Sequence, residues 1–431
     1  MLDLGVKPRH VQPLLRELLS SFPAVAILGA RQVGKSTLAQ ILIRDAWKAR
    51  YVTLDDPAVL AAVAHDPDGW LDSQGTVPLV LDEVQRAPDL LRAVKYAIDR
   101  ERRPGRFLLT GSANFLTLAR VSESLAGRVA LVDLLPFSWR EWIGQEPHSW
   151  LEKAFEADSA EELVPLFAEG NPPPIVELRD QVLWGGFPPV RLMRGTTARA
   201  KWLASYIVTY LDRDLREISS IHRVPDFHRL LIALASRSGQ LLNLADLGRD
   251  LGMVEMTVRR YVGILETTFQ LFRVEAYFTK IGKRLVKRPK VYFTDTGLAC
   301  HLLGIHDWES LQRAGKAGAM VETWVAGELK KWMNAQQAEY QLYFFRLHAG
   351  PEVDFLLARG EEIIAIEVKT GQQIDRGVLS TLERLEELLG GRLRMSVVLH
   401  GGPYLGPLAK RVLALPLTRA FGPSLTEADS A

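Results

Sequence analysis

The stretch GARQVGKST at residues 29–37 constrains this chain more than any other feature. It follows the apolar run AVAIL at 24–28 and precedes a segment with helical spacing of apolar residues at 38–43. This order predicts a strand, a tight loop and a helix, with the complete G-x-x-x-x-G-K-[ST] spacing of a phosphate-binding loop. A chance glycine turn followed by Lys-Ser is the alternative, and the strand–loop–helix context disfavours it. The chain is therefore predicted to bind a nucleoside triphosphate.

Each residue type in this loop has a chemical reason. Gly29 and Gly34 let the backbone curl so that successive N–H groups point into one concavity. The helix that begins near Gly34 directs its partial positive charge at the same anion. Lys35 is predicted to reach the β and γ phosphates, and the Ser36 hydroxyl is predicted to coordinate Mg²⁺. The predicted nucleotide-binding residues are Gly29, Gln32, Val33, Gly34, Lys35, Ser36 and Thr37.

Two acidic residues follow a later buried strand. The apolar run at 79–81 leads directly into Asp82 and Glu83. Asp82 is predicted to hold Mg²⁺, directly or through water, and Glu83 to polarise the attacking water as a general base. A catalytic glutamate at this place favours nucleotide hydrolysis, because a small-molecule kinase would not need it.

Strands alternating with helices predict an α/β fold. We expect strands at 24–28, 51–55, 79–81, 107–110 and 130–134, with helical segments between them. Such a chain forms a parallel sheet sandwiched by helices, of the P-loop NTPase type. Its ligand binds at the carboxyl ends of the strands.

Three further residues are candidates for contact with the nucleotide. After the fourth strand, Ser112 and Asn114 can contact the γ-phosphate and orient the water, and Asn114 is the better candidate; a plain polar turn is the alternative. Arg128 precedes the fifth strand. It is either an arginine finger that acts on a neighbouring subunit's nucleotide in a homo-oligomer, or an ordinary surface arginine.

Composition sets only broad limits. A chain of 431 residues suggests two to four domains, and a net charge of +2 does not by itself imply a partner. The single cysteine, Cys300, cannot form an intrachain disulfide, so a reducing, cytoplasmic location is expected. No apolar run approaches the ~20 residues that a membrane helix needs, and no signal-peptide core is visible. No membrane association is therefore expected.

Proline, glycine and acidic segments divide the chain into predicted parts. Within residues 236–305, a short helix closes on Gly252 and a second helix begins at Val254, which is a helix-turn-helix outline. A hairpin-like segment follows and completes a winged-helix pattern. The predicted parts are a P-loop core at 1–145, a helical lid or linker at 146–235, a winged-helix domain at 236–305, an α/β domain at 306–415 and a tail at 416–431.

The strongest local charge lies in the predicted wing. Six cations and no acid occur between residues 280 and 290. Such a strip suits nucleic-acid phosphates; a solvated loop or a docking surface for an acidic protein is the alternative. The predicted nucleic-acid contacts are Arg259, Arg260, Lys280, Lys283, Arg284, Lys287, Arg288 and Lys290.

A second set of acidic residues lies near the C-terminus. Asp354 begins one predicted strand, and Glu367 and Lys369 project from one face of the next strand. Two carboxylates can hold Mg²⁺ or Mn²⁺, and the lysine can activate a water for attack on a phosphodiester. Glu322, on a preceding helix, can complete the shell through a water. An ordinary surface ion pair on a strand is the alternative.

Taken together, these motifs resemble the prokaryotic AAA-type ATPases that carry a C-terminal domain of unknown function. In that family an ATPase core is followed by a winged helix and a PD-(D/E)xK nuclease-like fold. The resemblance spans about residues 10–400 and rests on GARQVGKST, LVLDEVQRAP, LLTGSANF, SLAGRV, YLDRDLREI, KVYFTDTGLACHLLG, and EVDFLL with IEVK.

The resemblance implies ATP as the nucleotide, Asp82 and Glu83 as the metal and water residues, and Arg128 as a residue that acts in an oligomer. It also implies a nuclease-type site at Asp354, Glu367 and Lys369. The expected function is a Mg²⁺-dependent ATPase that acts on DNA and has an attached metal-dependent nuclease domain. The alternative is a nucleotide-driven switch whose C-terminal domain binds protein or nucleic acid without cleaving it.

Overall fold

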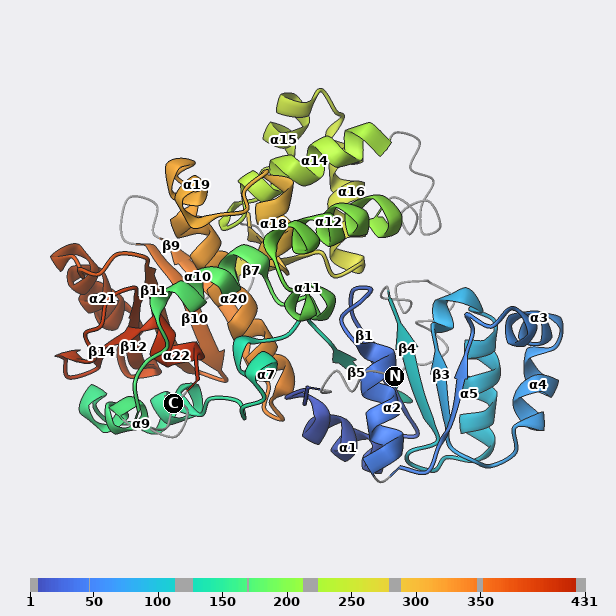
Figure 1. Cartoon of the computed structure of the whole chain (residues 1–431). Coiled ribbons are helices and arrows are strands. Elements are labelled where there is room, and N and C mark those ends of the chain that lie inside the picture. The colour runs from blue at the N-terminus through green and yellow to red at the C-terminus, as the bar shows by residue number, and fades with distance from the viewer. Residues whose placement is uncertain are drawn as a thin grey trace.

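The computed structural model describes residues 7–45, 47–112, 127–168, 170–211, 224–278, 288–346 and 352–423. Within these ranges the strands form two sheets, one of five strands and one of nine. Figure 1 shows the five-stranded sheet with its helices on the right, the larger sheet on the left, and α14, α15 and α16 at the top. None of the described helices is long and apolar enough to cross a membrane.

The five-stranded sheet has the order β2-β3-β4-β1-β5, and every adjacent pair is parallel. The predicted α/β fold with a parallel sheet is confirmed. Both faces of its centre are buried, which is typical of parallel sheets covered by helices. Its strands are β1 (Ala24–Leu28), β2 (Arg50–Thr53), β3 (Leu79–Asp82), β4 (Phe107–Gly111) and β5 (Val129–Asp133).

Side-chain alternation along β1 builds a core on each side of this sheet. Val25 and Ile27 pack into the larger core, which also holds residues of α1 and α2, whereas Ala24, Ala26 and Leu28 pack into the core beneath α5. The helices of this part are α1 (Gln12–Ser21), α2 (Lys35–Asp45), α3 (Pro57–His65), α4 (Pro67–Ser73), α5 (Leu90–Arg100) and the short η1 (Val84–Arg86).

A run of helices follows the first sheet, and its first members contact the C-terminal part of the chain. Trp139 and Trp324 lie 6.1 Å apart, and Trp150 and Phe421 lie 6.3 Å apart, measured between ring centroids. The helices are α7 (Trp139–Ile143), α8 (Trp150–Glu156), η3 (Ala160–Leu163), α9 (Pro165–Ala168), α10 (Ile175–Trp184), α11 (Pro188–Leu192), α12 (Thr196–Tyr206), η4 (Ile207–Leu211) and α14 (Val224–Ser236).

The segment from 240 to 293 has two helices joined by a glycine turn. Asn243 caps α15 by accepting from the N–H of Asp246 at 3.3 Å, and Gly252 ends that helix with φ of 65°. The elements are β6 (Gln240–Leu241), α15 (Leu244–Leu251), α16 (Glu255–Thr267), β7 (Leu271–Ala276) and β8 (Lys290–Phe293).

These three strands join the C-terminal strands in one sheet of the order β13-β14-β12-β11-β10-β9-β7-β8-β6. The joint is a parallel pairing of β7 with β9, in which Glu275 is opposite Tyr343. The predicted parts at 236–305 and 306–415 are thus continuous through backbone hydrogen bonds. The remaining elements are α18 (Thr296–Leu302), α19 (Trp308–Arg313), α20 (Ala317–Ala335), β9 (Gln341–Arg346), β10 (Glu352–Arg359), β11 (Glu362–Lys369), α21 (Arg376–Leu389), η5 (Gly390–Arg392), β12 (Leu393–His400), β13 (Gly406–Ala409), β14 (Val412–Pro416) and α22 (Leu417–Phe421).

Candidate functional site

The phosphate loop connects the carboxyl end of β1 to the start of α2. Gly34 has φ of 96°, a conformation that favours glycine. A Cβ on Gly29 would lie 2.2 Å from the carbonyl oxygen of Leu134, so only glycine fits there. The Lys35 ammonium is buried and donates to the carbonyl oxygens of Gly29 and Ala30 at 3.0 and 2.9 Å. The lysine therefore lies over the loop, on the side where phosphate oxygens bind in such loops.

Three hydroxyl groups converge on the carboxylate of Asp82. Ser36 Oγ lies 3.0 Å from Oδ1, the Tyr51 hydroxyl donates to Oδ2 at 2.7 Å, and the Thr110 hydroxyl donates to Oδ1. Burial and the charge of Asp82 together raise the pKa of Tyr51 above its ordinary value, so Tyr51 remains a donor. Hydroxyl and carboxylate oxygens are the ligands that Mg²⁺ prefers, and Ser36 and Asp82 are therefore a fitting pair for it.

Glu83 follows Asp82 in a left-handed backbone conformation, with φ of 60°. Its N–H donates to Thr110 Oγ1 at 3.2 Å, and its carboxylate accepts from the side-chain amide of Gln85. The same amide donates to Ser112 Oγ at 2.9 Å. Strained backbone of this kind is held only by its surroundings and is concentrated at functional sites. Ser112 is thus joined to Glu83 through Gln85, whereas Asn114 lies outside the described residues.

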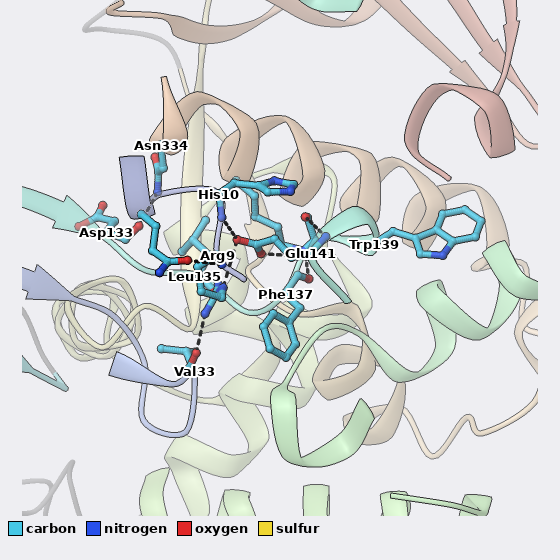
Figure 2. Close-up of polar contacts among 12 residues, drawn as sticks. Arg9, His10, Val33, Asp133, Leu135, Phe137, Trp139, Glu141 and Asn334 are labelled. Atoms are coloured by element: carbon cyan, nitrogen blue, oxygen red, sulfur yellow. Dashed lines mark hydrogen bonds and ion pairs between the residues drawn. The ribbon is translucent and has the colours of Figure 1, made fainter. Parts of the chain in front are cut away.

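The back of the phosphate loop is held by Arg9, as Figure 2 shows. Its guanidinium donates to the carbonyl oxygens of Val33 and Leu135 at 2.8 and 2.6 Å, and to Glu141 at 3.1 Å. Arg9 is only 6% exposed. Burial alone would raise the pKa of Glu141, but the charges of Arg9 and His10 hold it below its usual range. Glu141 therefore stays charged in the interior.

The same network continues into the C-terminal part of the chain (Figure 2). The Trp139 N–H, at the start of α7, donates to Glu328 at 3.1 Å. The Asn334 amide donates to the carbonyl oxygen of Asp133 at 3.2 Å, and Lys331 donates to that of Phe137 at 3.0 Å. Glu328, Lys331 and Asn334 all belong to α20, so this helix contacts the segment that wraps the phosphate loop.

A cavity of about 150 Å³ lies directly beside the loop. The Lys7 ammonium lies 5.3 Å from the centre of the Trp142 ring at this cavity. Aromatic and aliphatic side chains form most of its walls, which suits a flat apolar group. The lining residues are Lys7, Arg9, Val33, Gly34, Thr37, Leu38, Ile41, Phe137, Trp142, Pro188 and Leu192.

Arg128 lies at the opposite edge of the sheet. Its neighbour Val129 pairs with Ala24 at the amino end of β1, whereas the phosphate loop follows Leu28 at the carboxyl end. The guanidinium of Arg128 makes an ion pair with Asp99 at 2.7 Å. Arg128 is therefore remote from the phosphate loop of the same chain.

The predicted C-terminal residues come together at one end of β10 and β11. Lys369 donates to Glu367 at 2.7 Å, and the N–H of Val368 donates to Asp354 Oδ2 at 2.9 Å. Burial, followed by the charges of Glu322 and Glu367, raises the pKa of Asp354 well above its ordinary value. Asp354, Glu367 and Glu322 thus form one largely buried carboxylate cluster, and the half-buried Lys369 is one of its counter-ions.

Lys290 also belongs to this cluster, which corrects its predicted place on an exposed basic strip. Its side chain is 5% exposed, and its ammonium lies 3.0 Å from Glu322, 2.9 Å from Glu352 and 3.9 Å from Asp354. A buried ammonium held by three carboxylates is not available to a nucleic-acid phosphate. The error arose because a run of cations in the sequence does not show which of them begins a buried strand.

In the described conformation the cluster does not fit a divalent cation. Within the described ranges, no three His, Cys, Asp or Glu side chains are arranged so that they could hold a metal ion. Two ammonium groups, those of Lys290 and Lys369, pair with the carboxylates instead.

The other predicted nucleic-acid residues are divided between exposed and undescribed positions. Arg259 and Arg260 are exposed on α16, and Arg288 is exposed just before β8. Arg259 makes an i,i+4 ion pair with Glu255 at 2.8 Å. The predicted contacts that lie outside the described residues are Lys280, Lys283, Arg284 and Lys287.

Four residues that contact the site were not predicted from the sequence. Thr110 and Tyr51 bind Asp82, Gln85 binds Glu83, and Arg9 holds the loop. Gln85 lies two residues after Glu83, and Thr110 lies at the end of the strand next to β1, so both had a signal. Tyr51 and Arg9 had none, because their roles depend on contacts with distant parts of the chain.

Comparison with protein families gives three matches along the chain. Residues 21–143 match an AAA domain, which supports an AAA-type ATPase domain at the N-terminus. Residues 175–309 and 317–420 match two domains of unknown function, DUF8612 and DUF4143.

Three relatives of similar sequence each bear the name uncharacterized protein. The proteins Mb2031c of Mycobacterium bovis and Rv2008c of Mycobacterium tuberculosis are each 31% identical over 416 residues, which covers 95% of this chain and 84% of theirs. The chain therefore belongs to the same family as these two proteins. MJ1544 of Methanocaldococcus jannaschii is 20% identical over 79% of this chain and 73% of its own length.

Solved structures are more distant. The Walker-type ATPase PABY2304 of Pyrococcus abyssi is 16% identical with a TM-score of 0.45, and covers 70% of this chain and 99% of its own. The ORC2 protein of Aeropyrum pernix is 15% identical with a TM-score of 0.33, over 73% of this chain and 97% of its own. At these values neither likeness bears on function.

The buried pair of Arg9 and Glu141 generates a stability prediction. Arg9→Met leaves the buried Glu141 without its main counter-ion, and breaking a buried pair costs about 3–5 kcal/mol. We expect a clear loss of stability, and a smaller loss for Arg9→Lys, which keeps the charge but not the planar fork. Chemical denaturation measures both. Arg92→Met, at an exposed position on α5, should change stability by no more than ~0.5 kcal/mol. Equal stability of Arg9→Met and Arg92→Met would contradict the assigned role.

Proposed function

We propose that this AAA-type ATPase hydrolyses ATP with Mg²⁺ at the phosphate loop and uses the energy to act on DNA. The observation that supports hydrolysis best is the convergence of Ser36 and Asp82, with Glu83 adjacent and held by Gln85. Ser36 follows β1 at the start of α2, and Asp82 ends β3, so these groups lie at the carboxyl edge of the sheet, where ligands of such sheets bind.

Each residue has a role that follows from its position. Lys35 exchanges its loop carbonyl partners for phosphate oxygens when nucleotide binds. Ser36 and Asp82 hold Mg²⁺, which when bound neutralises charge that develops on the phosphates. Glu83 accepts the proton of the attacking water, and Gln85 with Ser112 orients its carboxylate. The apolar cavity beside the loop suits the purine base.

Glu83→Gln tests this assignment. The variant keeps the shape of the side chain but cannot accept a proton, so turnover should fall by about 10²–10⁴-fold. Binding of a fluorescent ATP analogue should stay within about threefold of wild type, since the phosphates are held by other groups. Steady-state hydrolysis and titration measure the two quantities. Lys35→Ala is the companion variant, in which binding and turnover should both be lost; surviving turnover there would mean that the nucleotide site is elsewhere.

DNA is the partner that we propose for the segment at 236–305. The two helices joined at Gly252, followed by β7 and β8, suit a winged helix, a fold that places its second helix in the major groove. Arg259, Arg260 and Arg288 are exposed on this segment and can meet phosphates. An acidic protein surface is the alternative partner for the same charges.

Reversing these charges tests whether the segment at 236–305 binds DNA. The triple change of Arg259, Arg260 and Arg288 to Glu should weaken duplex binding at least about tenfold and flatten its salt dependence, because fewer counter-ions are released. Fluorescence anisotropy over a salt series measures both effects. The matched control carries the same charge change at three scattered exposed positions, Arg44, Arg92 and Arg313. If the two triple variants bind DNA equally, the contact surface lies elsewhere.

We also propose that the protein works as a homo-oligomer in which Arg128 acts across a subunit interface. Its position at the edge opposite its own phosphate loop is consistent with action only on a neighbour's nucleotide. In the single chain Arg128 pairs with Asp99, so this ion pair would have to open on assembly.

For the C-terminal domain we propose two alternative functions. The convergence of Asp354, Glu367 and Lys369 suits a metal-dependent nuclease, in which Mg²⁺ or Mn²⁺ would have to displace Lys290 from the carboxylates. The close pairing of these carboxylates with Lys290 and Lys369 favours the second, a non-cleaving module that binds protein or nucleic acid and is moved by ATP.

A cleavage assay separates these two functions. If the domain is a nuclease, the wild-type protein should cut single-stranded, duplex or branched DNA with Mg²⁺ or Mn²⁺, and Lys369→Ala should lower the rate by at least about 100-fold. ATP hydrolysis should be unchanged in that variant, which controls for folding. Gel analysis of the three substrates, with and without ATP, gives the answer. The absence of cutting on all of them would favour the non-cleaving module.

A further inference from the structure

We propose that Lys290 is a built-in counter-cation of the C-terminal carboxylate cluster and sets the affinity of that cluster for divalent cations. Its ammonium takes the place between Glu322, Glu352 and Asp354 that an external cation would share. A divalent cation can then bind only by displacing it. This inference rests on the proposed cation chemistry of the C-terminal site.

Lys290 is surrounded by three carboxylates, as a bound cation would be, and does not form a single salt bridge. Glu322 and Glu352 each lie within 3.0 Å of its Nζ atom, and Asp354 lies at 3.9 Å. Glu322 also accepts from the Tyr292 hydroxyl at 2.7 Å, which holds that carboxylate in place. One ammonium thus gathers three carboxylates from α20 and β10.

The backbone keeps Lys290 at this position. It is the first residue of β8 and pairs with Leu241 of β6 on one side and with Val274 of β7 on the other. Its stem is buried, and its ammonium lies 5.6 Å from the centre of the Phe344 ring. Burial alone would lower the pKa of Lys290, but the surrounding carboxylates raise it above its ordinary value. The charge is therefore present wherever the protein is folded at neutral pH.

Lys290 and a divalent cation would compete for the same carboxylates. Among the described lysines, Lys290 is the one whose ammonium lies within 4 Å of Glu322, Glu352 and Asp354. Lys369 pairs with Glu367 instead. Lys290 and Lys369 pair with Glu322, Glu352 and Glu367, and the Arg346 guanidinium lies 3.6 Å from Glu352, so cations of the chain itself offset these carboxylates. Removal of Lys290 takes away one of these cations and frees oxygen ligands, and both effects favour a divalent cation.

Mn²⁺ binding tests the inference without any measurement of activity. In a background that carries Asp82→Asn, to weaken the cation site at the phosphate loop, electron paramagnetic resonance reports free Mn²⁺ during titration. Lys290→Met should tighten binding at least about tenfold relative to the background. Arg346→Met is the matched control: Arg346 Nε lies 3.6 Å from Glu352 but on the exposed side, and its loss should change affinity by less than about threefold. Unchanged or weaker binding by Lys290→Met overturns the inference.

Two additions keep the result decisive. Removal of Lys290 leaves buried carboxylates without a partner, so the variant is expected to unfold at a lower temperature. Mn²⁺ should then raise its melting temperature by several degrees more than that of the background, and no difference in that rise counts against the inference. Asp354→Asn added to Lys290→Met should abolish the gain in affinity. If it does not, the cluster is not a cation site, and it is the proposed function that fails.

Discussion

The architecture depends on one buried guanidinium. Arg9 binds the carbonyl oxygen of Val33 in the phosphate loop, that of Leu135 after β5, and the carboxylate of Glu141 in α7. Glu141 in turn completes a capping box with Ser138 at the start of α7. A single side chain near the N-terminus thereby joins the nucleotide loop to the segment that leads into the second half of the molecule. Its removal leaves a loop, a strand end and a helix start without a common partner.

Helix α20 carries this connection to the other site. Glu328, Lys331 and Asn334 contact the segment that wraps the phosphate loop, and Glu322, six residues before Glu328, belongs to the carboxylate cluster. Six residues of helix span only ~9 Å. One helix therefore contributes Glu322 to the carboxylate cluster and also contacts the segment that follows β5, next to the phosphate loop.

The parts of the fold that depend on nearby residues in the sequence could be predicted from it. The five strands could be predicted because buried strands are continuous apolar runs, and the place of the loop at 29–37 because one strand–loop–helix unit sets its spacing. Ser36 and Asp82 meet because each follows a strand of the same parallel sheet. The C-terminal residues Asp354 and Glu367 meet as expected from adjacent strands. Arg9 was missed because its partner Glu141 is 132 positions away. Lys290 was misplaced because charge density in a sequence carries no information on burial.

The pairing of β7 with β9 has a consequence for how the protein is made. Tyr343 is synthesised 68 residues after Glu275, its partner across the two strands. At a synthesis rate of ~5–20 residues per second, one edge of β7 stays unpaired for several seconds before β9 leaves the ribosome. An open strand edge is a template for pairing with other chains. The continuous sheet that unites the middle and C-terminal parts therefore makes the nascent chain dependent on timing, and a stop between these parts would leave that edge open permanently.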